Sequence, residues 1–111
     1  MGSILPFPAP VSGGQVGFER SELKRIVDLY GRMVAAGLWR DYAIAFEPGA
    51  AAFWAFRRTA ERPEYRIEKR PPARRGPWTL IDEGGRILRS GDALASVLAP
   101  IERRLLKVVA Q

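Results

Sequence analysis

Apolar residues recur at helical spacing in the segment between positions 19 and 36. The members of this stripe are Leu23, Ile26, Val27, Tyr30, Met33 and Val34. Residues three, four and seven positions apart share one side of a helix, so this segment should form an amphipathic helix. The helix should run from about Glu19 to Ala36. Glu19 and Glu22 place negative charge at its N-terminus, and Gly37 suits the left-handed position after its last turn.

Shorter segments with alternating apolar residues follow, and turn residues separate them. The alternation predicts strands at about 42–46, 51–58, 65–69, 78–82 and 86–89. Glu47-Pro48-Gly49 and Gly84-Gly85 should close hairpins. Three prolines and a glycine between positions 70 and 77 exclude a regular ladder there, so this segment should be a loop.

The end of the chain should be helical. Its apolar stripe consists of Leu94, Val97, Leu98, Ile101 and Leu105. Ser90 can cap this helix, and Asp92 is favourable in its first turn. Pro100 interrupts the stripe, because its ring would clash with the carbonyl of Ser96. We therefore expect a kink, or a break at which Pro100 begins a second short helix.

The order of elements predicts an α+β fold. Sequential strands joined by short turns usually form an antiparallel meander, here of about four to five strands. The N-terminal and C-terminal helices should then pack on one face of the sheet, and the other face should carry much of the exposed charge. Residues 1–15, rich in proline and glycine, should be a disordered tail, and residues 16–111 a single α+β domain.

Composition excludes several classes of protein. The chain has no cysteine and no histidine, so disulfides, thiolate metal sites, a cysteine nucleophile and a Ser-His-Asp triad are all impossible. We therefore expect no enzyme, no cofactor and no metal. The apolar runs are too short for a membrane span, and no secretory signal is readable. A cytoplasmic location with no membrane partner is the resulting expectation.

Positive charge is concentrated in one segment. The chain carries a net charge of +6, and positions 57–75 hold eight basic and three acidic residues, a local charge of +5. The candidate polyanion-binding residues, the basic strip, are Arg57, Arg58, Arg66, Lys69, Arg70, Arg74 and Arg75. Arginine forks match phosphate oxygens, and nearby Trp54, Tyr65 and Trp78 could stack on bases if they are exposed. The interleaved Glu61, Glu64 and Glu68 favour an alternative, in which the arginines only form ion pairs and the aromatics belong to the core.

Two further groups of residues are candidates for function. The carboxylates Asp41, Asp82 and Glu83 show no spacing that brings a catalytic pair together, and an aspartate at a hairpin usually serves the turn. Leu105, Leu106, Val108 and Val109 exceed what one helical stripe needs. They could form a homodimer or dock another protein, or they could cover the sheet.

One stretch resembles a known family. Positions 29–37 read LYGRMVAAG and continue as WRDYAI at 39–44, followed by FRR at 56–58, YRIEKRP at 65–71 and ARRG at 73–76. This pattern resembles an alphaproteobacterial family catalogued as domain of unknown function number twenty-seven ninety-four. The resemblance covers the chain from about Phe18 to the last helix. It implies a small bacterial cytoplasmic protein and no particular activity, so no functional residue is carried over.

The leading hypothesis from the sequence is a non-enzymatic domain that binds RNA, DNA or another polyanion through the basic strip. The alternative is a protein-interaction or structural module that uses the apolar surface of its helices.

Overall fold

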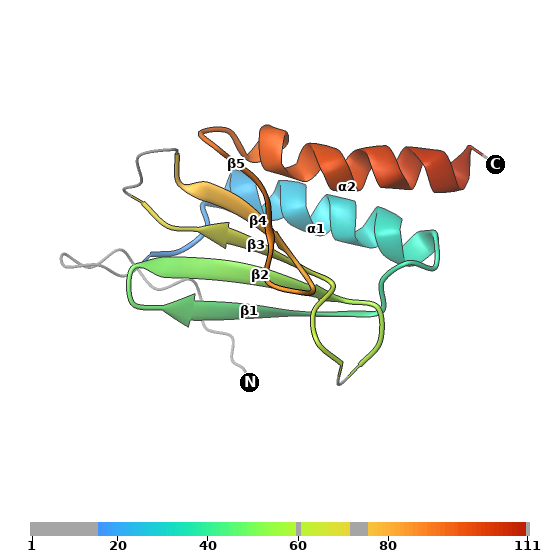
Figure 1. Cartoon of the computed structure of the whole chain (residues 1–111), viewed down its shortest axis with the longest axis horizontal. Coiled ribbons are helices and arrows are strands. Elements are labelled where there is room, and N and C mark those ends of the chain that lie inside the picture. Colours follow the sequence, from blue (N-terminus) through green and yellow to red (C-terminus); the bar gives the residue numbers. More distant parts are fainter. Residues whose placement is uncertain (1–15, 60, 72–75, 111) are drawn as a thin grey trace.

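The computed structural model describes residues 16–59, 61–71 and 76–110 of the chain, so the predicted tail at 1–15 lies outside the described residues. A five-stranded antiparallel sheet packs against two helices (Figure 1). In chain order the elements are α1 (Arg20–Ala35), β1 (Asp41–Glu47), β2 (Ala50–Phe56), β3 (Tyr65–Lys69), β4 (Trp78–Asp82), β5 (Ile87–Gly91) and α2 (Leu94–Val109). The predicted α+β class is confirmed.

The sheet is a meander in which every strand pairs with its neighbour in the sequence, in the order β1-β2-β3-β4-β5. Register brings apolar residues into one row across it. Phe53 lies opposite both Ile44 and Ile67, and Ile67 lies opposite Leu80. Successive side chains of a strand point to opposite faces, so this row defines the face that the helices cover.

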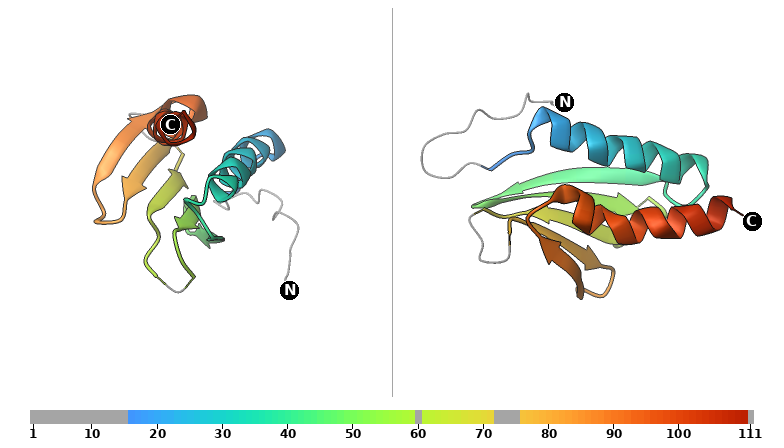
Figure 2. Two further views of the ribbon diagram at one scale, coloured as in Figure 1. Left: turned by 90° about the vertical axis from the view of Figure 1, so that its right-hand side faces the viewer. Right: turned by 90° about the horizontal axis from the view of Figure 1, so that it is seen from above.

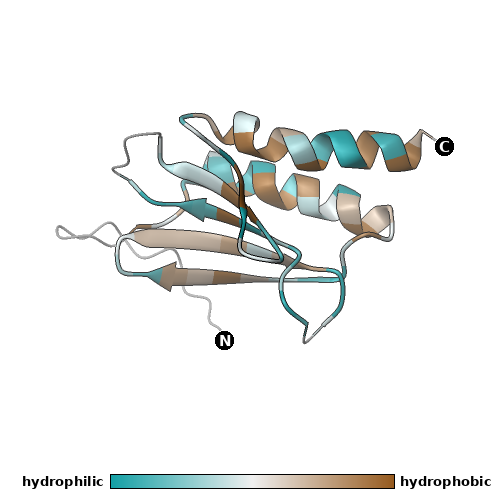
Figure 3. Cartoon of the chain, viewed as in Figure 1, coloured by the Kyte–Doolittle hydropathy of each residue, from teal (hydrophilic) through white to brown (hydrophobic). Residues whose placement is uncertain are grey.

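Both helices lie on that face. Seen along the long axis of the molecule, α1 lies over the side of the sheet that holds β1 and β2, and α2 over the side that holds β4 and β5 (Figure 2). The hydropathy colouring shows that β1 and β2 are apolar along most of their length (Figure 3). Phe53, Met33 and Ile101 are fully buried between the two layers. Neither of the two described helices is long and apolar enough to cross a membrane.

Local signals define the first helix as the sequence predicts. Glu19 precedes the first turn, and its backbone N–H donates to the Glu22 carboxylate over 2.7 Å. This satisfies one of the donors that a helix start leaves without an intrahelical partner. At the other end Gly37 has φ +78, a left-handed conformation that costs glycine little.

The start of the second helix differs from the prediction. Ser90 does not cap it. It lies in β5 opposite Thr79, and α2 begins at Leu94 after Ala93. The ladder with β4 continues to Gly91, so the backbone at Ser90 is already committed to the sheet.

Pro100 does not end α2, which runs without a break from Leu94 to Val109. The prediction of a second helix starting at Pro100 was therefore wrong. Proline lacks an N–H, so the carbonyl of Ser96 loses its helical donor. The Arg89 guanidinium on β5 donates to that oxygen over 3.4 Å. A side chain from the sheet thus donates the hydrogen bond that the Ser96 carbonyl loses to Pro100.

Neither helix covers the other face of the sheet, which we call the open face. Alternation places Ala52, Trp54 and Ile81 there, together with Arg66 and Glu68 of β3. Ala52 and Ile81 are buried although no helix lies above them. The open face therefore mixes charge with apolar surface, because the central strand β3 contributes Arg66 and Glu68 while Ala52, Trp54 and Ile81 lie beside them.

Candidate anion-binding site

Two adjoining hollows of about 360 and 450 Å³ lie where the α1–β1 turn, the β2–β3 connection and α2 meet. Together they are lined by Val34, Gly37, Leu38, Trp39, Arg40, Arg57, Arg58, Glu61 and Arg104. We call this site the arginine cleft. Its lining holds four arginines and one glutamate, an excess of positive charge that makes the cleft a candidate site for anions.

The α1–β1 turn forms one wall of the cleft. The carbonyl of Met33 accepts hydrogen bonds from the backbone N–H groups of Leu38 (2.9 Å) and Trp39 (3.3 Å), which closes the end of α1. The N–H of Arg40 then donates to the carbonyl of Phe56 over 2.8 Å. This bond fixes Arg40 beside the end of β2, where Arg57 leaves the sheet.

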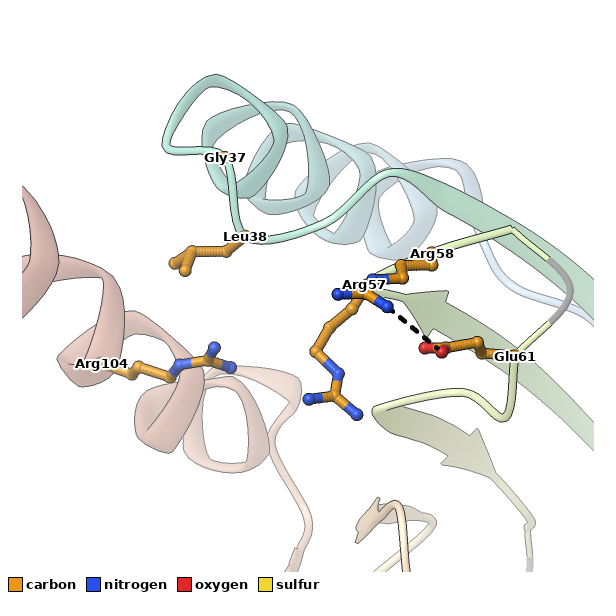
Figure 4. Close-up of a pocket in the computed structure, with 6 residues that line it drawn as sticks. All are labelled: Gly37, Leu38, Arg57, Arg58, Glu61 and Arg104. Atoms are coloured by element: carbon orange, nitrogen blue, oxygen red, sulfur yellow. Dashed lines mark ion pairs between the residues drawn. The ribbon is translucent and has the colours of Figure 1, made fainter.

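The β2–β3 connection forms the second wall. The sequence predicted a strand to Arg58, but β2 ends at Phe56, and both Arg57 and Arg58 lie in the connection. Figure 4 shows Arg57 and Arg104 directed toward the same space from opposite sides, with Leu38 and Gly37 on the turn above them. The cleft therefore gathers residues from three separate parts of the sequence.

Glu64 forms ion pairs with two of the four arginines, Arg57 and Arg104. Its carboxylate lies 3.0 Å from the Arg104 guanidinium and 3.9 Å from that of Arg57, and it also accepts a hydrogen bond from the Trp39 indole over 2.9 Å. Arg57 makes a closer pair with Glu83 at 2.7 Å. These contacts orient Arg57 and Arg104 and partly neutralise them.

Electrostatics at Arg104 agree with this geometry. Burial of the guanidinium lowers the pKa of Arg104, but hydrogen bonding and charge from Glu64 and Tyr65 together outweigh burial, so the pKa lies above its ordinary value. Arg104 is thus permanently charged.

The other two arginines of the cleft, Arg40 and Arg58, are exposed and make weaker ion pairs or none among the described residues. The Arg58 side chain is 76% exposed and lies 3.9 Å from Glu61, and exposed pairs of this kind contribute little. Arg40 is exposed and has no carboxylate within ion-pair distance among the residues that the structure describes. Arg40 and Arg58 are therefore the cations most available to a bound anion.

Lys69, a member of the predicted basic strip, lies elsewhere and has a different environment. Its side chain is only 13% exposed and points to the helix-covered face. The ammonium lies 2.7 Å from the Glu22 carboxylate, donates to the carbonyl of Gly17 over 3.1 Å, and lies 5.8 Å from the ring centre of Trp78. Lys69 therefore joins β3 to the start of α1.

The remaining members of the strip are spread over the sheet. Arg70 lies past the end of β3, 3.7 Å from Glu47 and 3.5 Å from Glu68. Arg66 lies on the open face and lines a separate hollow of about 340 Å³. That hollow is formed by Trp54, Arg62, Pro63, Arg66, Asp82, Glu83, Gly84 and Gly85. Its two arginines face two carboxylates. Arg74 and Arg75 lie outside the described residues.

The structure thus brings Arg57 and Arg58 together and adds Arg40 and Arg104, which sequence reasoning missed. Arg40 lies between the predicted end of the first helix at Ala36 and the first predicted strand, and no local signal singled it out. Arg104 lies more than forty residues away from Arg57 in the sequence, so only long-range packing places it in the cleft.

The aromatic residues near the strip belong mainly to the core. Trp78 is buried and stacks on Phe18 with ring centres 6.1 Å apart, and Tyr65 contacts Trp39 at 6.1 Å. Trp54 differs, because it is partly buried on the open face and its indole N–H has no partner among the described groups. Stacking of bases on Trp78 would therefore require the core to open.

Of the candidate carboxylates, Asp82 serves the β4–β5 turn. It accepts hydrogen bonds from the backbone N–H groups of Arg86 (2.8 Å) and Gly84 (3.0 Å). The bond from Arg86 is the main cause that lowers the pKa of Asp82 below its ordinary value. Glu83 pairs with Arg57, as described above. Within the described ranges no three His, Cys, Asp or Glu side chains form a group that could hold a metal ion.

The C-terminal apolar residues divide between the core and the surface. Leu105 is buried on the side of α2 that packs on the core, as expected if this segment covers the sheet. Leu106 and Val109 are at least 60% exposed, and Val108 is 40% exposed. The last turns of α2 therefore keep an apolar surface in the described structure.

Residues 16–98 match the model of a family described as "Protein of unknown function (DUF2794)". The match covers most of the chain, from just before α1 to the first half of α2. The chain belongs to this family. The DUF2794 match includes Arg40, Arg57 and Arg58 but ends before Arg104. No curated protein and no solved structure matches this DUF2794 chain.

Proposed function

We propose that this DUF2794 protein is a non-enzymatic nucleic-acid-binding domain whose arginine cleft contacts backbone phosphates. The observation that carries the proposal is the convergence of four arginines on one cleft whose lining includes a single carboxylate. Guanidinium groups bind phosphate oxygens through paired hydrogen bonds, which suits them better than lysine for this task.

The four arginines would have different roles. Arg57 and Arg104 are oriented by Glu64 and Glu83, so they form a preorganised base of the cleft. Arg40 and Arg58 are more exposed and would make the first contacts with phosphate. Arg74 and Arg75 remain predicted contributors from the β3–β4 loop.

A titration by fluorescence anisotropy tests the proposal. The purified chain is added to labelled single-stranded and double-stranded RNA and DNA at about 50 and about 200 mM salt. We expect binding that weakens steeply between the two salt concentrations, because contacts to phosphates release counterions. An Arg40→Ala/Arg58→Ala variant should bind at least about tenfold more weakly, since each lost phosphate contact removes part of this electrostatic term.

A matched control removes the same charge elsewhere. Arg20 and Arg103 are exposed and do not line the cleft, so Arg20→Ala/Arg103→Ala lowers net charge equally. Equal weakening by both double variants would mean that net charge alone attracts the nucleic acid, and would overturn the assignment to the cleft. An Arg74→Ala/Arg75→Ala variant tests the loop in the same way.

Absence of binding to every strand at the lower salt would overturn the nucleic-acid proposal as a whole. The competing function is a protein-interaction module, and the exposed Leu106 and Val109 at the end of α2 would be the first surface to test for it.

A further inference from the structure

β1 is an outer strand of the sheet, and no described strand pairs with its outer side. It has seven residues, and none of them is proline, glycine or lysine. The opposite outer strand, β5, is protected differently, because its pairing with β4 shifts register at Leu80/Ile81 and α2 packs against it. Unprotected outer strands are templates for pairing with another chain.

The sequence of β1 is nearly symmetrical about its centre. Positions 42–46 read Tyr-Ala-Ile-Ala-Phe, so an aromatic residue, an alanine and Ile44 are followed by an alanine and an aromatic residue. An antiparallel pair of two such strands centred on Ile44 places Tyr42 opposite Phe46 and Ala43 opposite Ala45. Aromatic cross-strand pairs stabilise a sheet, and a twofold axis repeats each favourable pair twice.

An apolar surface borders the same edge. Tyr42 and Phe46 are 47% and 41% exposed on the helix-covered face, and Val27 and Val34 of α1 are 40% and 41% exposed. Val27 and Val34 lie seven residues apart, hence on one side of α1. Between them Tyr30 contacts Tyr42, with ring centres 5.0 Å apart, so this side of α1 adjoins β1. A partner paired with β1 would also cover part of this surface.

We propose that two copies of this chain pair through β1, antiparallel about a twofold axis at Ile44, and form one continuous sheet. The symmetry of β1 identifies the partner as a second copy, because the aromatic residues and the alanines at 42–46 then each meet a residue of their own kind. A register shifted by two would place Tyr42 opposite Ile44 and Phe46 opposite Arg40, which removes the aromatic pairs. A shift by one would place the aromatic residues on the wrong face.

The acidic ends of β1 meet in the proposed register. In the proposed pair Asp41 lies opposite Glu47 of the second copy, which taken alone would be unfavourable. Arg70 lies 3.7 Å from Glu47 and so brings a positive charge to each of these positions. The strand residues that form the pair do not line the arginine cleft, and of the neighbouring exposed valines only Val34 does. Either proposal can therefore fail without the other.

The test measures the mass of the full chain by light scattering after size exclusion, and by sedimentation, from about 1 to about 200 µM. We expect a monomer–dimer equilibrium. Tyr42→Lys and Phe46→Glu should each weaken the dimer by about tenfold or more, because each change removes both aromatic pairs of a homodimer. Circular dichroism confirms that each variant is folded.

The decisive variants combine the two charges. A Tyr42→Lys/Phe46→Glu double variant places lysine opposite glutamate twice, and should dimerise better than either single variant. An equimolar mixture of the two single variants should dimerise more tightly than either variant alone, because the lysine introduced at position 42 of one chain then faces the glutamate introduced at position 46 of the other. Leu106→Lys, which changes an even more exposed apolar residue on α2, should leave the equilibrium unchanged.

Three results would overturn the proposal. The first is a monomer at every concentration. The second is a dimer that Leu106→Lys weakens as much as Tyr42→Lys does. The third is a full chain that becomes dimeric only after Leu5→Ser/Phe7→Ser, which would show that the chain's own N-terminal segment occupies the edge.

Discussion

Glu64 accepts a hydrogen bond from the indole nitrogen of Trp39 over 2.9 Å, and this contact joins the β2–β3 connection to the turn after α1. The same carboxylate holds Arg104 at 3.0 Å. Trp39 is only 3% exposed, so its N–H has little access to water. One acidic residue within the segment of highest positive charge therefore links three elements of the fold.

The first prediction follows from this contact. Glu64→Ala should lower the free energy of unfolding by about 2 kcal/mol, because a nearly buried indole donor loses its acceptor. Glu64→Gln should cost less than about 1 kcal/mol, since the amide oxygen can still accept that hydrogen bond. Urea denaturation followed by tryptophan fluorescence measures both. Equal losses in the two variants would contradict the role given to the Trp39 contact.

The pair between Lys69 and Glu22 should couple more strongly than a surface pair. Their side chains are 13% and 20% exposed, whereas those of Lys24 and Asp28 are 74% and 63% exposed. A double-mutant cycle with Lys69→Met and Glu22→Gln should give a coupling of about 1–2 kcal/mol. The matched cycle on Lys24 and Asp28 should give about 0.3–0.5 kcal/mol. Similar values for both pairs would show that burial does not strengthen the Lys69 contact.

Gly76 should tolerate no side chain. It has φ +94, and a Cβ placed there would lie 2.3 Å from the backbone carbonyl of Gly91. Gly76→Ala should therefore destabilise the protein by at least about 3 kcal/mol, from the left-handed backbone and the clash together. Gly49 has φ +76 but open space around it, so Gly49→Ala should cost only about 1 kcal/mol. Thermal unfolding of the two variants side by side checks this difference.

Asp82 should make stability depend on acid pH. Hydrogen bonds from the backbone N–H groups of Arg86 and Gly84 lower the pKa of Asp82 in the folded chain below the ordinary value of 3.8. Its contribution is therefore fully present above about pH 4, and is lost as pH falls through the lower folded pKa. The wild type should exceed Asp82→Asn in stability at pH 6, and the two should converge as pH is lowered toward 2. A constant difference over this range would contradict the assignment.

Arg89 and Pro100 should be coupled through the carbonyl of Ser96. Arg89→Ala removes a donor to that oxygen and should cost about 1 kcal/mol. In a Pro100→Ala background residue 100 regains its N–H, which can donate to Ser96 within the helix, so the same Arg89→Ala change should cost clearly less. Chemical denaturation of the four chains gives both costs. Identical costs in the two backgrounds would mean that the Arg89 contact is independent of Pro100.

Short-range signals in the sequence determined the elements of this fold. The stripe of α1 and its end at Gly37, the five alternating segments and the short turns between them were sufficient to predict a meander with two helices. The errors occurred where strand pairing, and not the local pattern, set the end of an element. Ser90 is a good cap residue, but the ladder with β4 continues past it, and β2 ends before Arg57 although the pattern continues to Arg58.

Only the tertiary structure decided which charges share a surface. Alternation within β3 separates Lys69 from Arg66 by face, so a strip that is continuous in the sequence is divided in space. Packing of α2 and the hydrogen bond from Arg40 to Phe56 instead bring Arg40 and Arg104 to Arg57. Charge along a chain is a local property, whereas a binding surface depends on which distant segments meet. The sequence by itself therefore determined the layers of this protein, and the packing of its helices on the sheet determined the cleft.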